Sequence, residues 1–236
     1  MSTPGAASDP NRAILVLVAR ALGELCEELV FVGGCATGLL VTAVRAQAVR
    51  MTEDVDLVAQ VTTASEYHAM EARLAAKGFK HDLSADAPIC RWRCNEIEVD
   101  LMPSGDVLGF HNRWYPLAIE SAQRLALDDG LSIRLVTAPV FIGTKLEAFK
   151  GRGNNDFLLS HDLEDILTVV DGRPELADEM QDAPAALRQY VAAEFRTLMN
   201  TPAFLQALAG HLPGDSASQQ RLPGLLARLR QLSQLA

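Results

Sequence analysis

Two short segments in which acidic and apolar residues alternate constrain the fold of this chain more than any other feature of its sequence. They lie at residues 54–58 and 97–102, and their acidic positions are Asp54, Asp56, Glu98 and Asp100. Residues two apart point to the same face of a strand, so each segment predicts a strand with two carboxylates on one face. The apolar side chains on the opposite face would then pack into a hydrophobic core.

The chain up to residue 138 alternates expected helices with expected strands, and the chain beyond it has the periodicity of helices alone. The helices expected in the first part are residues 10–28, 35–46 and 63–77. The strands expected there are residues 29–32, 55–61, 89–94, 97–102 and 133–136. The helices expected in the second part are residues 139–150, 161–170, 175–180, 184–199, 202–211 and 222–235. The polar corner Asn95-Glu96 predicts that the two strands around it form an antiparallel hairpin.

This order of elements predicts an α/β (α+β) fold, in which a mixed sheet flanked by helices is followed by a C-terminal helical region. We expect residues 1–9 to be a disordered tail, residues 10–138 to form the α/β core and residues 139–236 to form the helical region. Within the last part, residues 213–220 are rich in small and polar types, which predicts a linker before the final helix.

Composition and charge exclude several classes of protein. The chain has 49% hydrophobic residues, which excludes a disordered protein. Its net charge of −9 argues against nonspecific coating of nucleic acid, although a small groove formed by Arg91, Arg93 and Arg152 would still suit an RNA end. The apolar run near the start is too short to span a bilayer and no basic secretion signal precedes it, so we expect a soluble cytoplasmic protein without a membrane partner.

Two of the four cysteines, Cys90 and Cys94, are close enough in sequence to suggest a zinc site. A zinc site usually shows a second pair of ligands at suitable spacing, and none follows here. The alternation in residues 89–94 instead predicts a strand in which Cys90, Trp92 and Cys94 share a buried face.

The carboxylates of Asp54 and Asp56 need a neighbouring cation or proton, because two such groups held close together repel each other. Oxygen ligands without a nearby His or Cys favour a hard ion such as Mg²⁺ or Mn²⁺ over zinc. If the two acidic strands lie side by side, Asp100 completes a cluster of three carboxylates, which suits two ions that clamp a triphosphate and activate an attacking oxygen. The alternative is that these acids are only solvated residues at the start of a strand.

A diglycine turn, Gly33-Gly34, separates the expected strand at residues 29–32 from the helix that follows. Backbone N–H groups at the start of a helix bind phosphate, and glycine permits close approach. Such a turn also occurs for steric reasons alone. Its position about twenty residues before Asp54 is what makes it evidence for a phosphate-binding site here.

These motifs resemble the minimal nucleotidyltransferases of the DNA polymerase β superfamily. The shared features are the diglycine turn, the string Arg50-x-Thr52-x-Asp54-Val55-Asp56 and the strand Val99-Asp100-Leu101. Within that superfamily the chain is most similar to the AbiEii/AbiGii toxin type, which includes the MenT toxins. That group has a late lysine helix and an Asp-x-x-Asp helix, which match Lys145-Leu146-Glu147-Ala148 with Arg152, and Asp162-Leu163-Glu164-Asp165.

The resemblance implies a role for each matching residue. Asp54, Asp56 and Asp100 would be the metal ligands, and Asp100 would also be the base for a substrate hydroxyl. Lys145 would bind the phosphates of a nucleoside triphosphate (NTP), and Asp165 would orient that lysine or the nucleotide. Many members have a serine after the first glycine, which is missing here, so backbone N–H groups or Thr37 would replace its contact. The full set of implied nucleotide-binding positions is Gly33, Gly34, Thr37, Arg50, Thr52, Lys145, Arg152 and Asp165.

The implied activity is metal-dependent transfer of a nucleoside monophosphate (NMP) from an NTP, ATP included, to an acceptor hydroxyl, with the C-terminal helices completing the active-site cleft. For the toxin group the implied acceptor is the 3′ end of tRNA and the implied partner is a cognate antitoxin. Two alternatives remain at this point. One is transfer to a small hydroxyl compound such as an aminoglycoside, and the other is a noncatalytic nucleotide-binding or interaction module.

Overall fold

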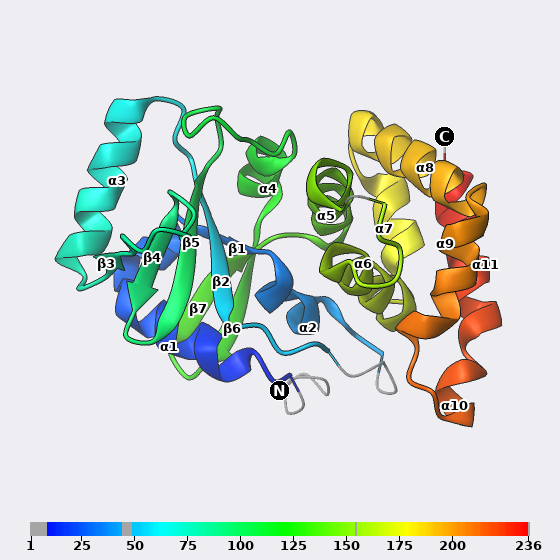
Figure 1. Cartoon of the computed structure of the whole chain (residues 1–236). Helices are drawn as coiled ribbons and strands as arrows, with labels where there is room; N and C mark the ends of the chain where they lie inside the picture. The colour runs from blue at the N-terminus through cyan, green and yellow to red at the C-terminus, as the bar shows by residue number, and fades with distance from the viewer. Residues whose placement is uncertain (1–8, 44–48, 154, 236) are drawn as a thin grey trace. The chain divides into compact units, whose positions relative to one another are not determined.

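The computed structural model describes residues 9–43, 49–153 and 155–235, in which the chain divides into two compact units (Figure 1). The first, which we call the sheet unit, comprises Pro10–Gly38 and Arg50–Thr137. The second, the helical unit, comprises Met1–Asp9, Leu39–Val49 and Ala138–Ala236, as far as these are described.

The sheet unit is built on seven strands in the order β3-β4-β5-β2-β1-β7-β6 (Figure 1). The strands are β1 (Val30–Val32), β2 (Asp54–Ala59), β3 (Lys80–His81), β4 (Arg91–Cys94), β5 (Ile97–Pro103), β6 (Gln123–Asp128) and β7 (Leu131–Leu135). The pairs β2·β5 and β1·β7 are parallel and the remaining neighbours are antiparallel. The mixed sheet expected from the sequence is therefore confirmed.

Helices and the hydrophobic core hold this sheet together. The helical segments of the unit are α1 (Arg12–Leu22), η1 (Gly23–Glu27), η2 (Gly34–Ala36), the start of α2 (Thr37–Leu40), α3 (Ala64–Ala76) and α4 (Tyr115–Ser121). Helix α1 packs against β7, β2 and β6. Phe31, Leu57 and Leu101, from three adjacent strands, are completely buried, which places the core behind the strands that carry the acidic residues.

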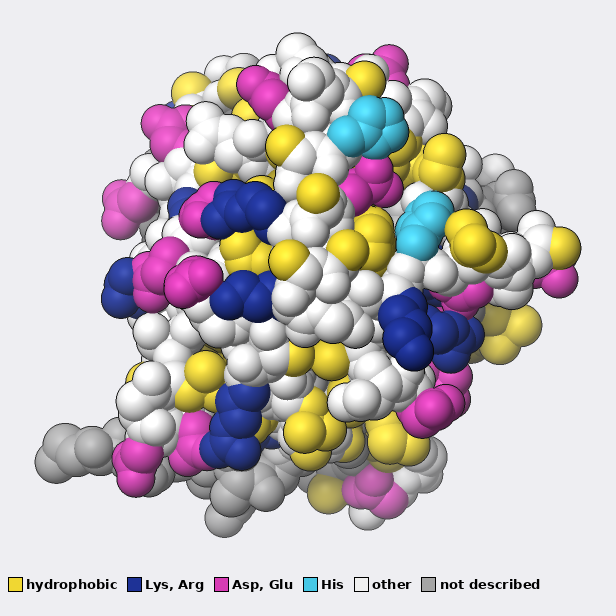
Figure 2. Space-filling model, turned by 90° about the vertical axis from the view of Figure 1, so that its left-hand side faces the viewer, with side chains coloured by type: hydrophobic (Ala, Val, Ile, Leu, Met, Phe, Trp, Pro, Cys, Tyr) yellow, Lys and Arg dark blue, Asp and Glu magenta, His cyan; other side chains and the backbone are white. Residues whose placement is uncertain are grey.

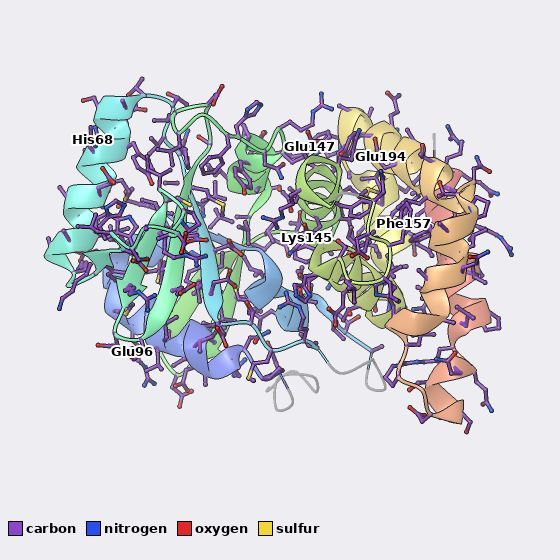
Figure 3. The ribbon with its side chains drawn as sticks, in the orientation of Figure 1. His68, Glu96, Lys145, Glu147, Phe157 and Glu194 are labelled. Atoms are coloured by element: carbon purple, nitrogen blue, oxygen red, sulfur yellow. The ribbon has the colours of Figure 1, made fainter. Side chains whose placement is uncertain are left out.

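The helical unit contains the end of α2 and the elements that follow β7. They are α5 (Ala138–Arg152), α6 (His161–Gly172), α7 (Leu176–Asp182), α8 (Ala185–Met199), α9 (Pro202–Ala207), η3 (Leu208–His211), α10 (Ser216–Gln219) and α11 (Leu222–Ser233). Helix α8 packs against α5 and α11. Two polar contacts also join α5 to α8: the Tyr190 hydroxyl donates to Glu147 at 2.7 Å, and Lys150 pairs with Glu194 at 2.7 Å. Figure 3 labels the two glutamates.

The hairpin predicted around Asn95 is confirmed, because β4 and β5 pair in antiparallel register with Cys94 opposite Ile97. Asn95 occupies the left-handed region at φ 54°, which asparagine tolerates better than most residues. Cys90, Trp92 and Cys94 are all buried, as expected for one core face. Burial also raises the pKa of the Cys90 thiol to about 12, so this cysteine is protonated at neutral pH.

Three expected helices are shorter than predicted, and one of them, at residues 202–211, ends as α-helix at Ala207 and continues as the 3-10 segment η3. The helix at residues 10–28 ends at Leu22, because Gly23 adopts φ 58° and the chain continues as a 3-10 turn. The helix at residues 35–46 ends at Leu40, and the N–H groups of Thr42 and Ala43 donate to the Gly172 carbonyl instead of continuing the helix. Residues 44–48 of that expectation lie outside the described part of the chain.

Four short elements were not expected from the sequence: β3, β6, α4 and α10. Helix α10 lies inside the segment predicted to be a linker, where Asp215 caps it by accepting from the Ser218 N–H at 3.0 Å. The expected tail, residues 1–9, falls outside the described residues except for Asp9. Among the described helices, none is long and apolar enough to cross a membrane.

Candidate active site

Three carboxylates meet on one face of the sheet because their two strands are adjacent and in register. Strands β2 and β5 pair in parallel, with Asp56 opposite Asp100 and Asp54 opposite Glu98. One carboxylate oxygen each from Asp54, Asp56 and Asp100 lies within 4.8 Å of the other two. In the part of the chain that the structure describes, this is the only group of His, Cys, Asp or Glu side chains suited to a metal ion. We call these three residues the acidic cluster.

The diglycine turn packs directly against the acidic cluster. Strands β1 and β2 pair with Val32 opposite Asp56, so Gly33 follows immediately beside that carboxylate. Gly33 has φ 69°, and a Cβ atom on it would lie 1.7 Å from Oδ2 of Asp56. Any side chain at this position would therefore collide with Asp56, which explains the glycine physically. Gly34 begins the 3-10 turn η2 and is buried, as are Cys35 and Ala36 after it.

A hydrogen-bond network fixes the segment that leads into β2. The Thr52 hydroxyl donates to Oδ1 of Asp54, which orients this member of the acidic cluster. Asn11, fully buried at the start of α1, accepts from the Thr52 N–H at 2.9 Å and donates to the Arg50 carbonyl at 2.9 Å. One side chain therefore holds both ends of the Arg50-Met51-Thr52 segment. Thr37, at the start of α2, is 1% exposed, and its hydroxyl has no hydrogen-bond partner among the described residues.

Arg91 is the cation that faces the acidic cluster from the other side of β5. It lies opposite Asp100 in the β4·β5 pair, and its Nε and Nη2 donate to Oδ1 and Oδ2 of Asp100, each at 2.8 Å. Its Nη1 donates to Glu98, and its Nη2 lies 4.0 Å from Oδ2 of Asp54. The hydrogen bond to Asp100 raises the pKa of the Arg91 guanidinium further above its ordinary value, so it is always charged.

A ladder of ion pairs continues from Arg91 along the hairpin. Arg93 donates to Glu98 at 3.1 Å and to Asp82 at 2.7 Å. Hydrogen bonds from Ser84 and from Arg93 lower the pKa of Asp82, so the ladder stays ionised at neutral pH. Arg91 and Arg93 were expected to help form a groove for an RNA end. The structure gives both guanidinium groups carboxylate partners, Asp100 and Glu98 for Arg91, and Glu98 and Asp82 for Arg93. A groove for an RNA end stays a prediction.

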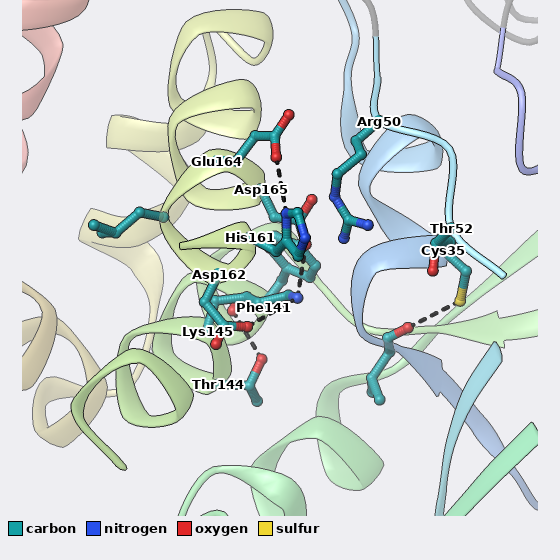
Figure 4. Close-up of polar contacts among 12 residues, drawn as sticks. Cys35, Arg50, Thr52, Phe141, Thr144, Lys145, His161, Asp162, Glu164 and Asp165 are labelled. Carbon is teal, nitrogen blue, oxygen red and sulfur yellow. Dashed lines mark hydrogen bonds and ion pairs between the residues drawn. The ribbon is translucent and has the colours of Figure 1, made fainter. Parts of the chain in front are cut away.

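The lysine and the Asp-x-x-Asp motif of the helical unit form a second charged group (Figure 4). Lys145 on α5 is 7% exposed, and its Nζ lies 2.7 Å from Oδ2 of Asp165 and 3.2 Å from Oδ1 of Asp162 on α6. Arg152 donates to both oxygens of Asp162, each at 2.9 Å. The expected pairing of Lys145 with Asp165 is present, and both aspartates are buried, so the ammonium is held between two carboxylates.

Asp162 has a larger role than the sequence suggested. An acid in the first turn of a helix interacts favourably with the helix start, and this alone would account for Asp162 in the sequence. The structure shows that Ser160 is the capping residue of α6 and that Asp162 is 5% exposed beneath Lys145 and Arg152. Burial alone would raise the pKa of this carboxyl, but the hydrogen bond from Arg152 and the charge of Lys145 outweigh it and lower the pKa.

Asn11 and Arg91 contact residues of the site in ways that sequence reasoning did not predict, since Arg91 was expected only in a groove for an RNA end. The signal for Arg91 was present, since Arg91 and Arg93 alternate with core residues in a strand next to the acidic strand. The position of Asn11 carries no such signal, because its contacts are with residues about forty positions away.

The donor set of the acidic cluster fits a hard divalent cation. All three candidate ligands are carboxylates, which suit Mg²⁺ or Mn²⁺, and the spacing of their oxygens would allow one ion to contact all three. The face formed by β2, β5 and β4 carries four carboxylates and two guanidinium groups, which leaves a net charge of −2 for a cation to neutralise.

Around α3 and β3, the Lys and Arg side chains of the described residues form no continuous area in Figure 2. Lys and Arg side chains are interspersed there with Asp and Glu side chains, and several pair across the surface. Examples are Arg73 with Glu28, at 2.5 Å, and Lys77 with Glu24, at 3.0 Å. This face of the sheet unit does not provide the clustered cations that a phosphate backbone requires.

Comparison with known proteins gives one family and two distant structural likenesses. The family model described as nucleotidyl transferase AbiEii toxin, type IV toxin–antitoxin system, matches residues 15–231. No curated protein matches the sequence significantly. The solution structure of the antibiotic-resistance factor ANT(2″)-Ia is 16% identical, with a TM-score of 0.46 over 80% of this chain and 98% of that one.

The second likeness is to the crystal structure of a protein from H. pylori that is assigned as a nucleotidyltransferase. It is 13% identical, with a TM-score of 0.44 over 96% of this chain and 93% of that one. Similarity at this level does not identify a substrate. The family match, which spans both units, agrees with the diglycine turn, the acidic strands and the lysine helix, and the chain belongs to the AbiEii family of nucleotidyltransferase toxins.

Proposed function

We propose that this nucleotidyltransferase uses the acidic cluster to hold divalent cations and transfers an NMP from an NTP to the 3′ end of a tRNA. The observation that carries the proposal is the register of β2 and β5, which sets Asp56 beside Asp100, together with the close approach of Gly33 to Asp56. Divalent cations at this position would neutralise the triphosphate and favour ionisation of the attacking hydroxyl.

The remaining roles in the proposal belong to residues of the chain. The N–H groups of Gly33 and Gly34, at the start of the η2 turn, bind phosphate oxygens, since glycine permits close approach. Asp100 accepts the proton of the acceptor hydroxyl, whose oxygen forms a bond to the α-phosphorus while the bond to pyrophosphate breaks. These contacts would lower the barrier to transfer by positioning the two substrates and by neutralising the charge of the triphosphate.

Lys145 is proposed as a phosphate-binding residue and Asp165 as the residue that orients it. Support comes from the 2.7 Å contact between them and from the burial of Asp165, which fixes the ammonium group. A lysine ammonium is a compact charge suited to phosphate. Arg50, Thr52, Thr37 and Arg152 complete the proposed nucleotide-binding set, with Thr52 acting through Asp54.

The test is transfer of label from each of the four NTPs, with Mg²⁺, into total RNA. We expect label in tRNA-sized bands with the wild-type protein and none with Asp56→Asn, because the substitution removes one charge from the cluster while keeping the side-chain shape. Glu96→Gln is the matched control, since Glu96 is exposed at the turn of the β4–β5 hairpin and outside the cluster. Transfer that persists in Asp56→Asn at the wild-type rate would contradict the proposal.

The toxin role is a separate part of the proposal, which includes a cognate antitoxin as partner. We expect expression of the wild-type chain to arrest growth, and expression of Asp56→Asn to leave growth unchanged. Resistance to an aminoglycoside without growth arrest would instead indicate a small hydroxyl compound as the acceptor. Mg²⁺-dependent NTP binding without transfer to any acceptor would indicate a noncatalytic module.

A further inference from the structure

Arg91 takes up both oxygens of a carboxylate that the proposed function assigns to a metal ion. Two parallel hydrogen bonds of 2.8 Å join its guanidinium to Asp100, in the bidentate geometry that makes arginine–carboxylate pairs strong. The pair is largely buried, with side-chain exposures of 19% for Arg91 and 11% for Asp100. Both oxygens of Asp100 therefore accept a hydrogen bond from the guanidinium group of Arg91.

The same guanidinium has a second anchor outside the acidic cluster. Its Nη1 donates to Glu98, which lies two residues before Asp100 on the same face of β5. Glu98 also accepts from Arg93, which in turn pairs with Asp82. This second anchor means that Arg91 can lose part of its contact with Asp100 without leaving the sheet or remaining as a buried unpaired charge.

We propose that Arg91 competes with the divalent cation for Asp100. Arg91 neutralises Asp100 until a metal ion binds one of the Asp100 oxygens, and Arg91 then remains paired with Glu98. This inference rests on the proposed function, because it takes Asp100 to be a metal ligand. Its consequence is that Arg91 weakens metal binding, through competition for Asp100 and through repulsion between like charges. A residue that merely oriented Asp100 for the metal would have the opposite effect on affinity.

The experiment is calorimetric titration of the whole chain with Mn²⁺ alone, comparing wild type with Arg91→Met. We expect Arg91→Met to bind Mn²⁺ at least about tenfold more tightly, because a unit charge a few ångströms from the site is removed. The matched control is Arg93→Met. Arg93 has the same charge, strand and face, but its hydrogen bonds go to Glu98 and Asp82 rather than to the acidic cluster.

Thermal unfolding supplies a second readout that does not depend on activity. In EDTA we expect Arg91→Met to unfold at a lower temperature than wild type, because the acidic cluster has lost its counter-charge. When Mn²⁺ is added, we expect the unfolding temperature of Arg91→Met to rise by more than that of wild type. If Arg91→Met does not fold, Arg91→Lys keeps the charge but not the bidentate geometry, and its Mn²⁺ affinity is expected to exceed that of wild type.

The possible results separate the two proposals. Two results would overturn the proposed competition while leaving the acidic cluster as a metal site. One is weaker or unchanged Mn²⁺ binding in Arg91→Met, and the other is an equal gain in Mn²⁺ affinity in Arg93→Met. If neither the wild type nor Arg91→Met bound Mn²⁺, the metal role of the cluster would fail and this inference would fail with it.

Discussion

A Cβ atom on Gly33 would lie 1.7 Å from Oδ2 of Asp56, so the turn after β1 and the carboxylate of β2 occupy adjoining space with no room for a side chain. We therefore expect Gly33→Ala to displace Asp56 and to reduce NMP transfer by about a hundredfold or more, as small misplacements of reacting groups do. Steady-state transfer assays with labelled NTP would measure this effect.

Gly130→Ala is the matched control for that substitution. Gly130 has φ 72°, close to the 69° of Gly33, but nothing lies within 4 Å of the position of its Cβ. Both variants place alanine at a positive φ, which strains its backbone, and the strain at Gly33 includes a ψ of −166°, a conformation that residues other than glycine hardly adopt. Only Gly33→Ala adds a collision with the cluster, so equal activities in the two variants would show that the contact does not matter for transfer.

Removal of the Asn11 side chain should loosen the segment that precedes Asp54. The amide of Asn11 satisfies one N–H and one carbonyl, those of Thr52 and Arg50, in a fully buried position. Leaving these groups without partners costs about 1–3 kcal/mol each, so Asn11→Ala should clearly lower the free energy of unfolding in urea.

Asn11→Asp tests which half of the amide matters. It keeps an acceptor for the Thr52 N–H but offers no donor to the Arg50 carbonyl, so we expect a loss of stability at neutral pH here as well. An exposed residue on the same helix, Arg20, pairs with Asp128 at 2.6 Å on the surface, and Arg20→Ala should change stability by less than about 1 kcal/mol. A loss in Asn11→Ala no larger than that of Arg20→Ala would contradict the bridging role.

The strands that carry the acidic cluster could be predicted because each shows a clear two-residue period. Alternation in residues 54–58 and 97–102 fixes which side chains share a face, and the order of the expected strands and helices gave the α/β part and the helical region. The register that brings Asp56 next to Asp100 depends on which strands are neighbours, and no local pattern determines that.

Elements with little local signal were missed for the same reason. Strand β3 contains only Lys80 and His81, and it exists because these residues pair with Arg93 and Trp92. Asp162 looked like an ordinary first-turn acid, and its burial under Lys145 and Arg152 follows from the packing of α5 on α6. In each case the deciding contact is with a residue distant in sequence.

Binding of a divalent cation to the acidic cluster should stabilise the folded chain. A ligand that binds only the native state raises the free energy of unfolding. Once the ligand concentration exceeds the dissociation constant, the rise grows with the logarithm of the ratio of the two. We expect Mg²⁺ or Mn²⁺ to raise the melting temperature and EDTA to reverse the rise. Asp54→Asn should abolish the shift, whereas Asp86→Asn, which alters an exposed acid in the loop before β4, should retain it. A shift of equal size in both variants would place the cation elsewhere.

Asp162 should stabilise the helical unit in a way that depends on pH. The hydrogen bond from Arg152 and the charge of Lys145 hold the pKa of Asp162 below its ordinary value of 3.8, despite burial. A carboxyl whose pKa is lower in the folded state contributes stability above the pKa of the unfolded chain and loses it as the pH falls through the folded value. Asp162→Asn removes this contribution and takes one of two neighbouring negative charges away from Lys145, at an expected cost of about 1–3 kcal/mol at pH 7.

The expected signature is the difference in unfolding free energy between wild type and Asp162→Asn, measured in urea from neutral to acidic pH. This difference should stay nearly constant down to about pH 5 and then shrink as Asp162 of the wild type takes up its proton. Glu164→Gln, on the same helix, is the control, because it removes the charge of an acid that pairs with the exposed His161, at 3.3 Å. A difference that grew as the pH fell would mean that Asp162 is destabilising when charged, because its burial then outweighs the attraction of Lys145 and Arg152.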